Sequence, residues 1–305
     1  MTPPTGRAGR WVAVLAVLLA GLTVGWLSWL AFGSGDARPG SSASPTAALT
    51  PGASRSSSPA PAGSEGPSAA AEASGAATLA GLTVALDPGH NGANATAPQQ
   101  VGALVPDGRG GTKACNTTGT STDDGYPEHA FAWDVAARTA ASLEALGARV
   151  VLTRSDDAGV GPCVDVRGAF AQEAGADVLV SVHANGTDDR SVRGFFVVLA
   201  DPPPVVEQAP GAREANASAS EALAGDMVEA LAAAGFAPSP IFPDGVSRRA
   251  DLATLNLAER PAVLLELGEM RNAEEAAVMV SDEGRQRYAD AVAAGLVTWA
   301  AGMAG

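Results

Sequence analysis

Residues 177–185 read Asp-Val-Leu-Val-Ser-Val-His-Ala-Asn, and this stretch decides the fold class. The run from Val178 to Val182 is almost entirely apolar, which is typical of a strand that is buried on both faces. Such strands occur mainly in parallel sheets with helices on either side. The run ends in His183, so the sequence places an imidazole at the carboxyl end of a central strand, where open α/β sheets bind their ligands.

Strand and helix patterns alternate on both sides of this strand. Apolar runs predict further strands at residues 82–87, 149–153, 194–200 and 262–267; helical patterns predict helices at residues 127–146, 164–174 and 216–234, and one or two helices from residue 273 onward. This alternation predicts an α/β fold, with a twisted, mostly parallel sheet and helices on both faces. We expect it to form a single catalytic domain at residues 80–305.

The N-terminal part of the chain differs from this domain. Residues 11–32 form a run of 22 residues without a charge, preceded by Arg7 and Arg10. A helix of that length spans about 33 Å, enough for a hydrocarbon core of roughly 30 Å. We expect a transmembrane signal anchor at 11–32, with residues 1–10 in the cytoplasm by the positive-inside rule. The alternative is a removed export signal, in which case the protein is secreted.

Residues 33–79 consist mainly of Gly, Ala, Ser, Thr and Pro, and this composition predicts a disordered linker. The chain of 305 residues has 19 Lys and Arg against 33 Asp and Glu, a net charge of −14. A nucleic-acid partner is therefore not expected, since phosphate binding needs a basic face. The Gly-rich stretch at 108–113 lacks the Walker order, so we expect no nucleotide partner either.

Four side chains capable of metal or proton chemistry fall near the predicted strand ends and at a helix start. His90 follows the first strand, His183 ends the central strand, Glu128 lies in the first turn of a helix and Glu266 lies inside an apolar strand. Two imidazoles and a carboxylate can form an open three-ligand zinc site, and the remaining carboxylate is then a candidate general base. The alternatives are that His90 and His183 are ordinary buried or surface histidines that bind no metal, and that Glu266 forms a salt bridge with an arginine such as Arg271.

A family resemblance rests on five motifs that occur in order. They are Asp87-Pro-Gly-His-Asn-Gly92, Glu128 at a helix start, Thr153-Arg-Ser-Asp-Asp157, Ser181-Val-His-Ala-Asn185 and Pro261-Ala-Val-Leu-Leu-Glu-Leu-Gly268 followed by Asn272. Over essentially the whole domain the chain resembles zinc-dependent N-acetylmuramoyl-L-alanine amidases of the Amidase_3 type. The resemblance implies one Zn²⁺ ion held by His90, Glu128 and His183, with Glu266 as the catalytic carboxylate. The implied substrate is peptidoglycan or a muropeptide, cleaved between N-acetylmuramic acid and L-alanine of the stem peptide.

The resemblance leaves some positions open. Asp87 and Asn185 are candidates to orient ligands or substrate, although both could simply close their turns. His129 adjoins Glu128 and is the alternative metal ligand. The family usually has an aromatic residue after the glycine of its last motif, whereas Gly268 is followed by Glu269, which predicts a polar pocket wall.

Cys115 and Cys163 form a pair in a domain expected outside the cytoplasm. We expect a disulfide between them, the alternative being two buried free thiols. Residues 201–215 could form a mobile flap. The sequence thus predicts a hydrolase that is anchored in a bacterial membrane with its catalytic domain outside the cytoplasm, or a hydrolase that is secreted. The competing hypothesis is a wall-binding or regulatory protein that has the same fold but no activity.

Overall fold

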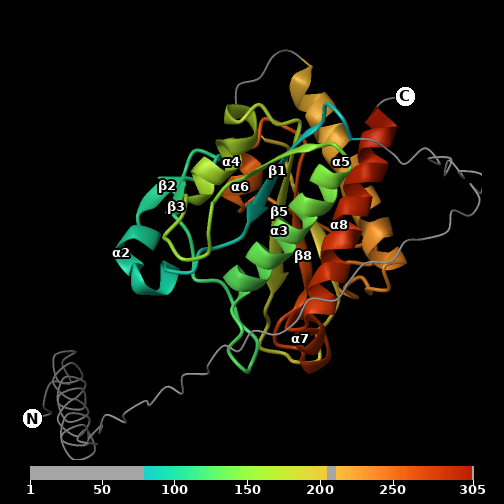
Figure 1. Ribbon diagram of the computed structural model, residues 1–305. Coiled ribbons are helices and arrows are strands. Elements are labelled where there is room, and N and C mark those ends of the chain that lie inside the picture. Colours follow the sequence, from blue (N-terminus) through green and yellow to red (C-terminus); the bar gives the residue numbers. More distant parts are fainter. Residues whose placement is uncertain (1–78, 205–210, 304–305) are drawn as a thin grey trace, which may run out of the picture. The chain divides into compact units, whose positions relative to one another are not determined.

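The fold is seen in a computed structural model that describes residues 79–204 and 211–303 (Figure 1). Its main sheet has six strands in the order β4-β1-β5-β8-β6-β7. The strands are β1 Thr83–Pro88, β4 Arg149–Leu152, β5 Val178–Asn185, β6 Phe196–Ala200, β7 Val246–Arg249 and β8 Ala262–Glu269. The four strands β4, β1, β5 and β8 run parallel to one another. Strand β6 runs antiparallel to β8, and β7 runs parallel to β6.

The central strand β5 is buried on both faces, as its apolar run predicts. Val180 and Val182 belong to one apolar cluster, together with Phe131 of α3 and Trp299 of α8. Leu179 belongs to the other cluster, which includes residues of α4 and α6. Burial of apolar side chains on both faces therefore holds the sheet between two layers of helices.

Three long helices cover one face of the sheet and two shorter ones cover the other. The first face carries α3 (Glu128–Ala145), α5 (Ala212–Ala233) and α8 (Asp282–Met303); the second carries α4 (Val164–Glu173) and α6 (Ala253–Asn256) (Figure 1). The helix α7 (Ala273–Met279) precedes α8. These layers confirm the predicted α/β class, the mostly parallel sheet and the helices on both faces.

Short elements fill the long connection from β1 to α3. They are a 3₁₀ turn η1 (Asn94–Thr96), the helix α2 (Pro98–Val101) and an antiparallel pair of strands, β2 (Leu104–Pro106) and β3 (Thr112–Ala114). This hairpin is held to the second face of the domain, because Lys113 Nζ donates to the carbonyl of Asp251 at 2.6 Å and Asn256 Nδ2 donates to the carbonyl of Asp107 at 2.8 Å.

Some boundaries differ from the expected ones. Helix α5 begins at Ala212 rather than at residue 216, so the last residues of the flap expected at 201–215 are helical, while residues 205–210 lie outside the described residues. Leu79, expected in the linker, is buried and donates from its N–H to the carbonyl of Leu146 at 2.8 Å. The domain therefore begins at or before residue 79.

Within the described residues, no helix is both long enough and apolar enough to cross a membrane. The expected anchor at 11–32, the segment 1–10 and the linker up to residue 78 lie outside those residues.

Candidate functional site

Three predicted metal ligands meet at the carboxyl end of the parallel strands. His90 follows β1, His183 lies near the end of β5, and Glu128 is the first residue of α3. Each of them offers one ligand atom, and these atoms all lie within 4.8 Å of one another. Residues far apart in the sequence thus form one cluster, as expected.

Both imidazoles point at a single oxygen of Glu128. His90 Nε2 lies 3.1 Å and His183 Nδ1 lies 2.9 Å from Oε1. The other oxygen, Oε2, accepts the N–H of Thr120 at 2.9 Å. Burial raises the pKa of the Glu128 carboxyl, but the charges and hydrogen bonds of His90 and His183 outweigh it and hold that pKa well below its usual range. The site therefore contains a buried carboxylate that faces two ring nitrogens.

A backbone carbonyl fixes which nitrogen of His90 faces Glu128. His90 Nδ1 lies 3.1 Å from the carbonyl oxygen of Thr117, which can only accept a hydrogen bond. Nδ1 therefore carries a proton, so that Nε2 can present its lone pair when a metal ion takes the place of its hydrogen bond to Glu128. Metal-binding histidines are typically oriented by such a bond at the second nitrogen. Two imidazoles and one carboxylate also match the donor set of catalytic zinc sites, so these residues fit the ion that the sequence predicts.

Two glycines allow the close packing around the cluster. A Cβ at Gly89 would lie 2.3 Å from Cε1 of His183. A Cβ at Gly119 would lie 2.8 Å from Oε2 of Glu128, and Gly119 also has a positive φ of 76°. Only a residue without a side chain fits either position.

Glu266 lies beside the cluster on the neighbouring strand β8, in register with His183 of β5. Its Oε2 atom is buried and has no hydrogen-bond partner. Burial and the nearby charges of Glu128 and Glu269 raise the pKa of the Glu266 carboxyl well above its ordinary value, against an opposing effect of Arg249. A carboxyl group with a raised pKa can exchange a proton near neutral pH, which is what general acid–base catalysis requires.

Arg271 does not form the alternative salt bridge with Glu266. Its guanidinium pairs with Asp123 and Asp188, at 3.2 Å in each case. These carboxylates are on exposed loops, whereas Glu266 is in the sheet, so Arg271 is turned away toward the surface.

His129, the alternative metal ligand, is outside the cluster. Its Nδ1 lies 2.8 Å from Oδ2 of Asp157, so the ring is bound to the loop that follows β4. Adjacent residues at the start of a helix point in different directions. Glu128 therefore faces the histidines while His129 does not.

The two candidate orienting residues have different surroundings. Asp87 is buried and accepts hydrogen bonds from Thr153 and Ser181, each at 2.6 Å, and from Arg167 at 2.5 Å. Burial raises the pKa of Asp87, but Arg167 and the two hydroxyls outweigh this and lower it overall. These bonds place Asp87 in the sheet beneath the cluster.

Asn185 is bound to Glu269, the residue that stands where the family usually has an aromatic side chain. Asn185 Nδ2 donates to Glu269 Oε1 at 2.6 Å, and the N–H of Thr187 donates to Oε2 at 3.0 Å. Glu269 is buried, so this carboxylate organises the loop after β5 rather than forming an open wall.

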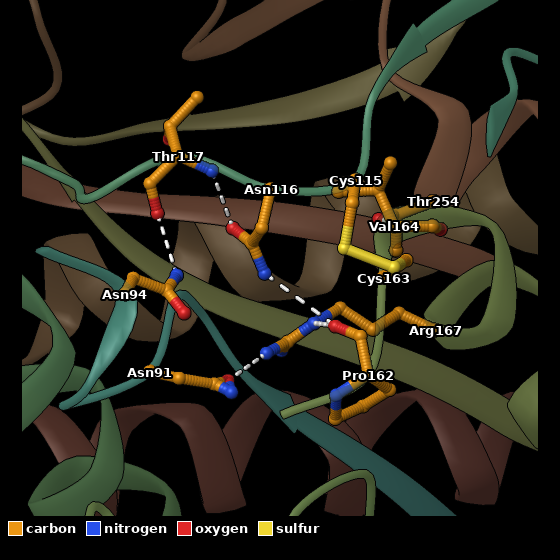
Figure 2. Close-up of a disulfide and its surroundings, with 10 residues drawn as sticks. All are labelled: Asn91, Asn94, Cys115, Asn116, Thr117, Pro162, Cys163, Val164, Arg167 and Thr254. Atoms are coloured by element: carbon orange, nitrogen blue, oxygen red, sulfur yellow. Dashed lines mark hydrogen bonds between the residues drawn. A yellow bond between two sulfur atoms is a disulfide. The ribbon is translucent and has the colours of Figure 1, made fainter. Parts of the chain in front are cut away.

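The disulfide joins the loop before α3 to the start of α4. Cys115 and Cys163 are bonded, with their Cα atoms 4.4 Å apart (Figure 2). The loop after Cys115 supplies both the Thr117 carbonyl and the Thr120 N–H. Figure 2 also shows the long side chain of Arg167 reaching past Pro162 toward Asn91.

Sequence reasoning missed four residues that contact the backbone or the side chains of the site, namely Thr117, Thr120, Arg154 and Arg167. The two threonines act through backbone atoms, for which the sequence carries no signal. Arg154 lies in one of the quoted motifs, but nothing there indicates its role. Arg167 is a lone arginine within a predicted helix, which usually indicates a surface residue.

Taken together, the fold and the site define a single domain of mixed α/β class whose His–Glu–His cluster could hold a metal ion. The family model for N-acetylmuramoyl-L-alanine amidase, Amidase_3, matches residues 84–298. The chain therefore belongs to this family and is an N-acetylmuramoyl-L-alanine amidase, which confirms the resemblance seen in its motifs.

Individual relatives agree with this assignment. N-acetylmuramoyl-L-alanine amidase Rv3717 of Mycobacterium tuberculosis is 44% identical over 221 residues, which are 72% of this chain and 87% of the relative. The crystal structure of the amidase Ami1 of Mycobacterium smegmatis is 44% identical and has a TM-score of 0.68, with 74% of this chain and 99% of that one covered. The apo form of Ami1 of Mycobacterium abscessus is also 44% identical, with a TM-score of 0.66 and coverage of 72% and 99%.

Proposed function

We propose that this amidase hydrolyses the bond between the lactyl group of N-acetylmuramic acid and L-alanine with the help of one zinc ion held by His90, Glu128 and His183. One observation carries the proposal. Two ring nitrogens point at one oxygen of Glu128, and Glu266, which is in register with His183, has a buried oxygen without a hydrogen-bond partner. When bound, zinc supplies Lewis acidity that polarises a carbonyl and makes water more acidic.

Glu266 is the proposed proton carrier. Its carboxylate accepts a proton from the attacking water, and the resulting acid donates that proton to the nitrogen of the departing alanine. The raised pKa of this carboxyl supports the second step, because a strongly acidic group would hold the proton too weakly to be an effective carrier near neutral pH. Its strand fixes the side chain beside His183, next to the proposed metal site.

Asp87 and Asn185 are proposed to act through position. Asp87 holds Arg167 beneath the cluster, and this arginine contacts the backbone on either side of Gly89. Asn185 lies two residues beyond His183 at the end of β5, where Glu269 fixes its amide. Asn185 is then available to orient the substrate peptide.

We further propose that the catalytic domain works outside the cytoplasm on peptidoglycan or muropeptides, tethered by an anchor at residues 11–32 and a linker at 33–78. The long uncharged run, the two preceding arginines and the disulfide support an exported, membrane-attached protein. Cleavage of the segment would release the enzyme instead.

Mass spectrometry of muropeptides incubated with the purified protein tests the proposed chemistry. We expect release of a stem peptide that begins with L-alanine, loss of this product after chelation and recovery on addition of zinc. Recovery with zinc but not with magnesium supports the nitrogen-containing donor set. Undiminished cleavage after complete metal removal would contradict the metal site. Full zinc loading with no cleavage would favour the wall-binding alternative.

A further inference from the structure

The backbone of His90 is held in an unfavourable conformation. Among the described residues, His90 is the only non-glycine residue with a positive φ, at 55°. This left-handed region costs an L-residue conformational energy, and such strain persists only where the surroundings enforce it.

Two buried arginines bind three consecutive carbonyl oxygens at this turn. Arg154 donates from Nε to the carbonyl of Pro88 at 3.0 Å and from its terminal nitrogen to that of Gly89 at 3.3 Å. Arg167 donates to the carbonyl of Pro88 at 2.8 Å and to that of His90, also at 2.8 Å. The carbonyl directions of residues 88–90 are therefore fixed from two sides.

Each arginine is anchored at a second point. Arg167 is paired with Asp87 in the protein interior, with 2% and 1% of the side chains exposed. Arg154 is paired with Asp157 at 2.8 Å and donates to the carbonyl of His129, also at 2.8 Å. A planar guanidinium with several fixed donors can bridge these groups simultaneously, whereas the single ammonium of a lysine cannot.

We propose that Arg154 and Arg167 are positioning residues that hold His90 in its left-handed conformation and so aim Nε2 at Glu128. The two arginines and the carbonyls of residues 88–90 form what we term the arginine clamp. The part of this inference that concerns metal affinity rests on the proposed metal site. The part that concerns the His90 backbone does not depend on any metal.

The first test measures zinc affinity by competition with a chelating dye, using the purified full-length protein. Arg154→Lys and Arg167→Lys keep the positive charge that faces Asp157 and Asp87 but lose the planar guanidinium with its several donors. We expect each variant to weaken zinc binding about 10–100-fold. Arg138→Lys is the matched control, because this arginine pairs with Asp134 and Asp282 on the helix surface. Wild-type affinity in both folded clamp variants would overturn the role of the clamp in metal binding.

The second test uses metal-free protein and compares His90→Gly with His90→Ala by denaturant unfolding. With the clamp intact, glycine fits the positive φ better, so we expect the unfolding constant to be at least about five-fold smaller for His90→Gly than for His90→Ala. In the Arg154→Lys or Arg167→Lys background this advantage should shrink or vanish, because the turn is free to relax. An unchanged advantage in both backgrounds would overturn the proposal.

The two tests separate this inference from the proposed function. A wild-type protein that binds no zinc would contradict the metal site, while the glycine–alanine comparison would still decide whether the clamp sets the backbone. If Arg167→Lys fails to fold because of its buried partner, Arg154→Lys carries both tests. A loss of stability without a change in either readout would show that the arginines serve the fold alone.

Discussion

At the scale of single residues, the buried pair Asp87–Arg167 makes stability depend on pH. The pKa of Asp87 is lower in the folded protein than in the unfolded chain, so the carboxylate contributes stability at neutral pH. This contribution is present above the ordinary carboxyl pKa of about 3.9 and is lost as the pH falls through the lower, folded-state value.

We predict that Asp87→Asn lowers the free energy of unfolding at pH 7 by about 3–5 kcal/mol, because it leaves Arg167 buried without its charged partner. The variant should also lose less stability than the wild type below pH 4. Urea unfolding at a series of pH values measures both effects. Asp226→Asn is the control of opposite sign, since burial raises the pKa of that carboxyl. Parallel pH curves for Asp87→Asn and the wild type would contradict the prediction.

A single methyl group should disturb the cluster at Gly89. We predict that Gly89→Ala weakens zinc binding, because its Cβ would overlap the His183 ring at 2.3 Å and displace Nδ1 from Glu128. Competition titration with a chelator provides the measurement. Gly225→Ala on helix α5 is the control, since a Cβ there meets no atom within 4 Å. An affinity for Gly89→Ala equal to that of this control would contradict the packing argument.

At the scale of elements, the disulfide ties the loop after Cys115 to helix α4 across a sequence separation of 48 residues. In the chain-entropy model, a closed loop of this size stabilises the fold by ~4 kcal/mol. We predict that Cys115→Ser combined with Cys163→Ser loses a free energy of unfolding of that order, measured by denaturant titration under non-reducing conditions. The zinc affinity should fall too, because the loop supplies the Thr117 carbonyl and the Thr120 N–H. Unchanged stability would contradict this account.

The sequence predicted the long elements because each has a strong pattern of its own. The strand at 178–185 is an almost continuous apolar run, and the helix at 128–145 begins just after Pro127. Strand β7 was missed because Val246–Arg249 is short and polar, a pattern that does not distinguish a strand from a loop. The antiparallel direction of β6 was also missed, because β6 is buried on both faces and its continuous apolar run resembles that of a parallel strand.

Only those parts of the site that depend on the chemical type of a side chain could be predicted from the sequence. His90, Glu128, His183 and Glu266 stood out as chemically capable residues near strand ends and at a helix start. The bonds that orient them come from backbone atoms at Thr117 and Thr120 and from arginines distant in sequence. Such contacts depend on the folded path of the chain, which local patterns do not encode.

At the scale of the whole molecule, an α/β amidase domain follows an N-terminal segment of different composition. We predict that the full-length protein sediments with bacterial membranes and is released by detergent but not by high salt. A chain that begins at residue 79 and carries an unrelated cleavable export signal is the control, and it should remain in the soluble exported fraction. Soluble full-length protein with a mature N-terminus beyond residue 32 would contradict the anchor and favour cleavage.

In the proposed mechanism His90, Glu128 and His183 bind the metal and Glu266 transfers the proton, and the turnover of muropeptide by zinc-loaded Glu266→Gln tells these two roles apart. We expect this variant to bind one zinc ion as the wild type does and to turn over at least about 10²-fold more slowly, because it cannot carry the proton. His183→Ala should lose both zinc and turnover. Glu274→Gln, at an exposed position on α7, should change neither. Near-normal turnover by zinc-loaded Glu266→Gln would contradict the account.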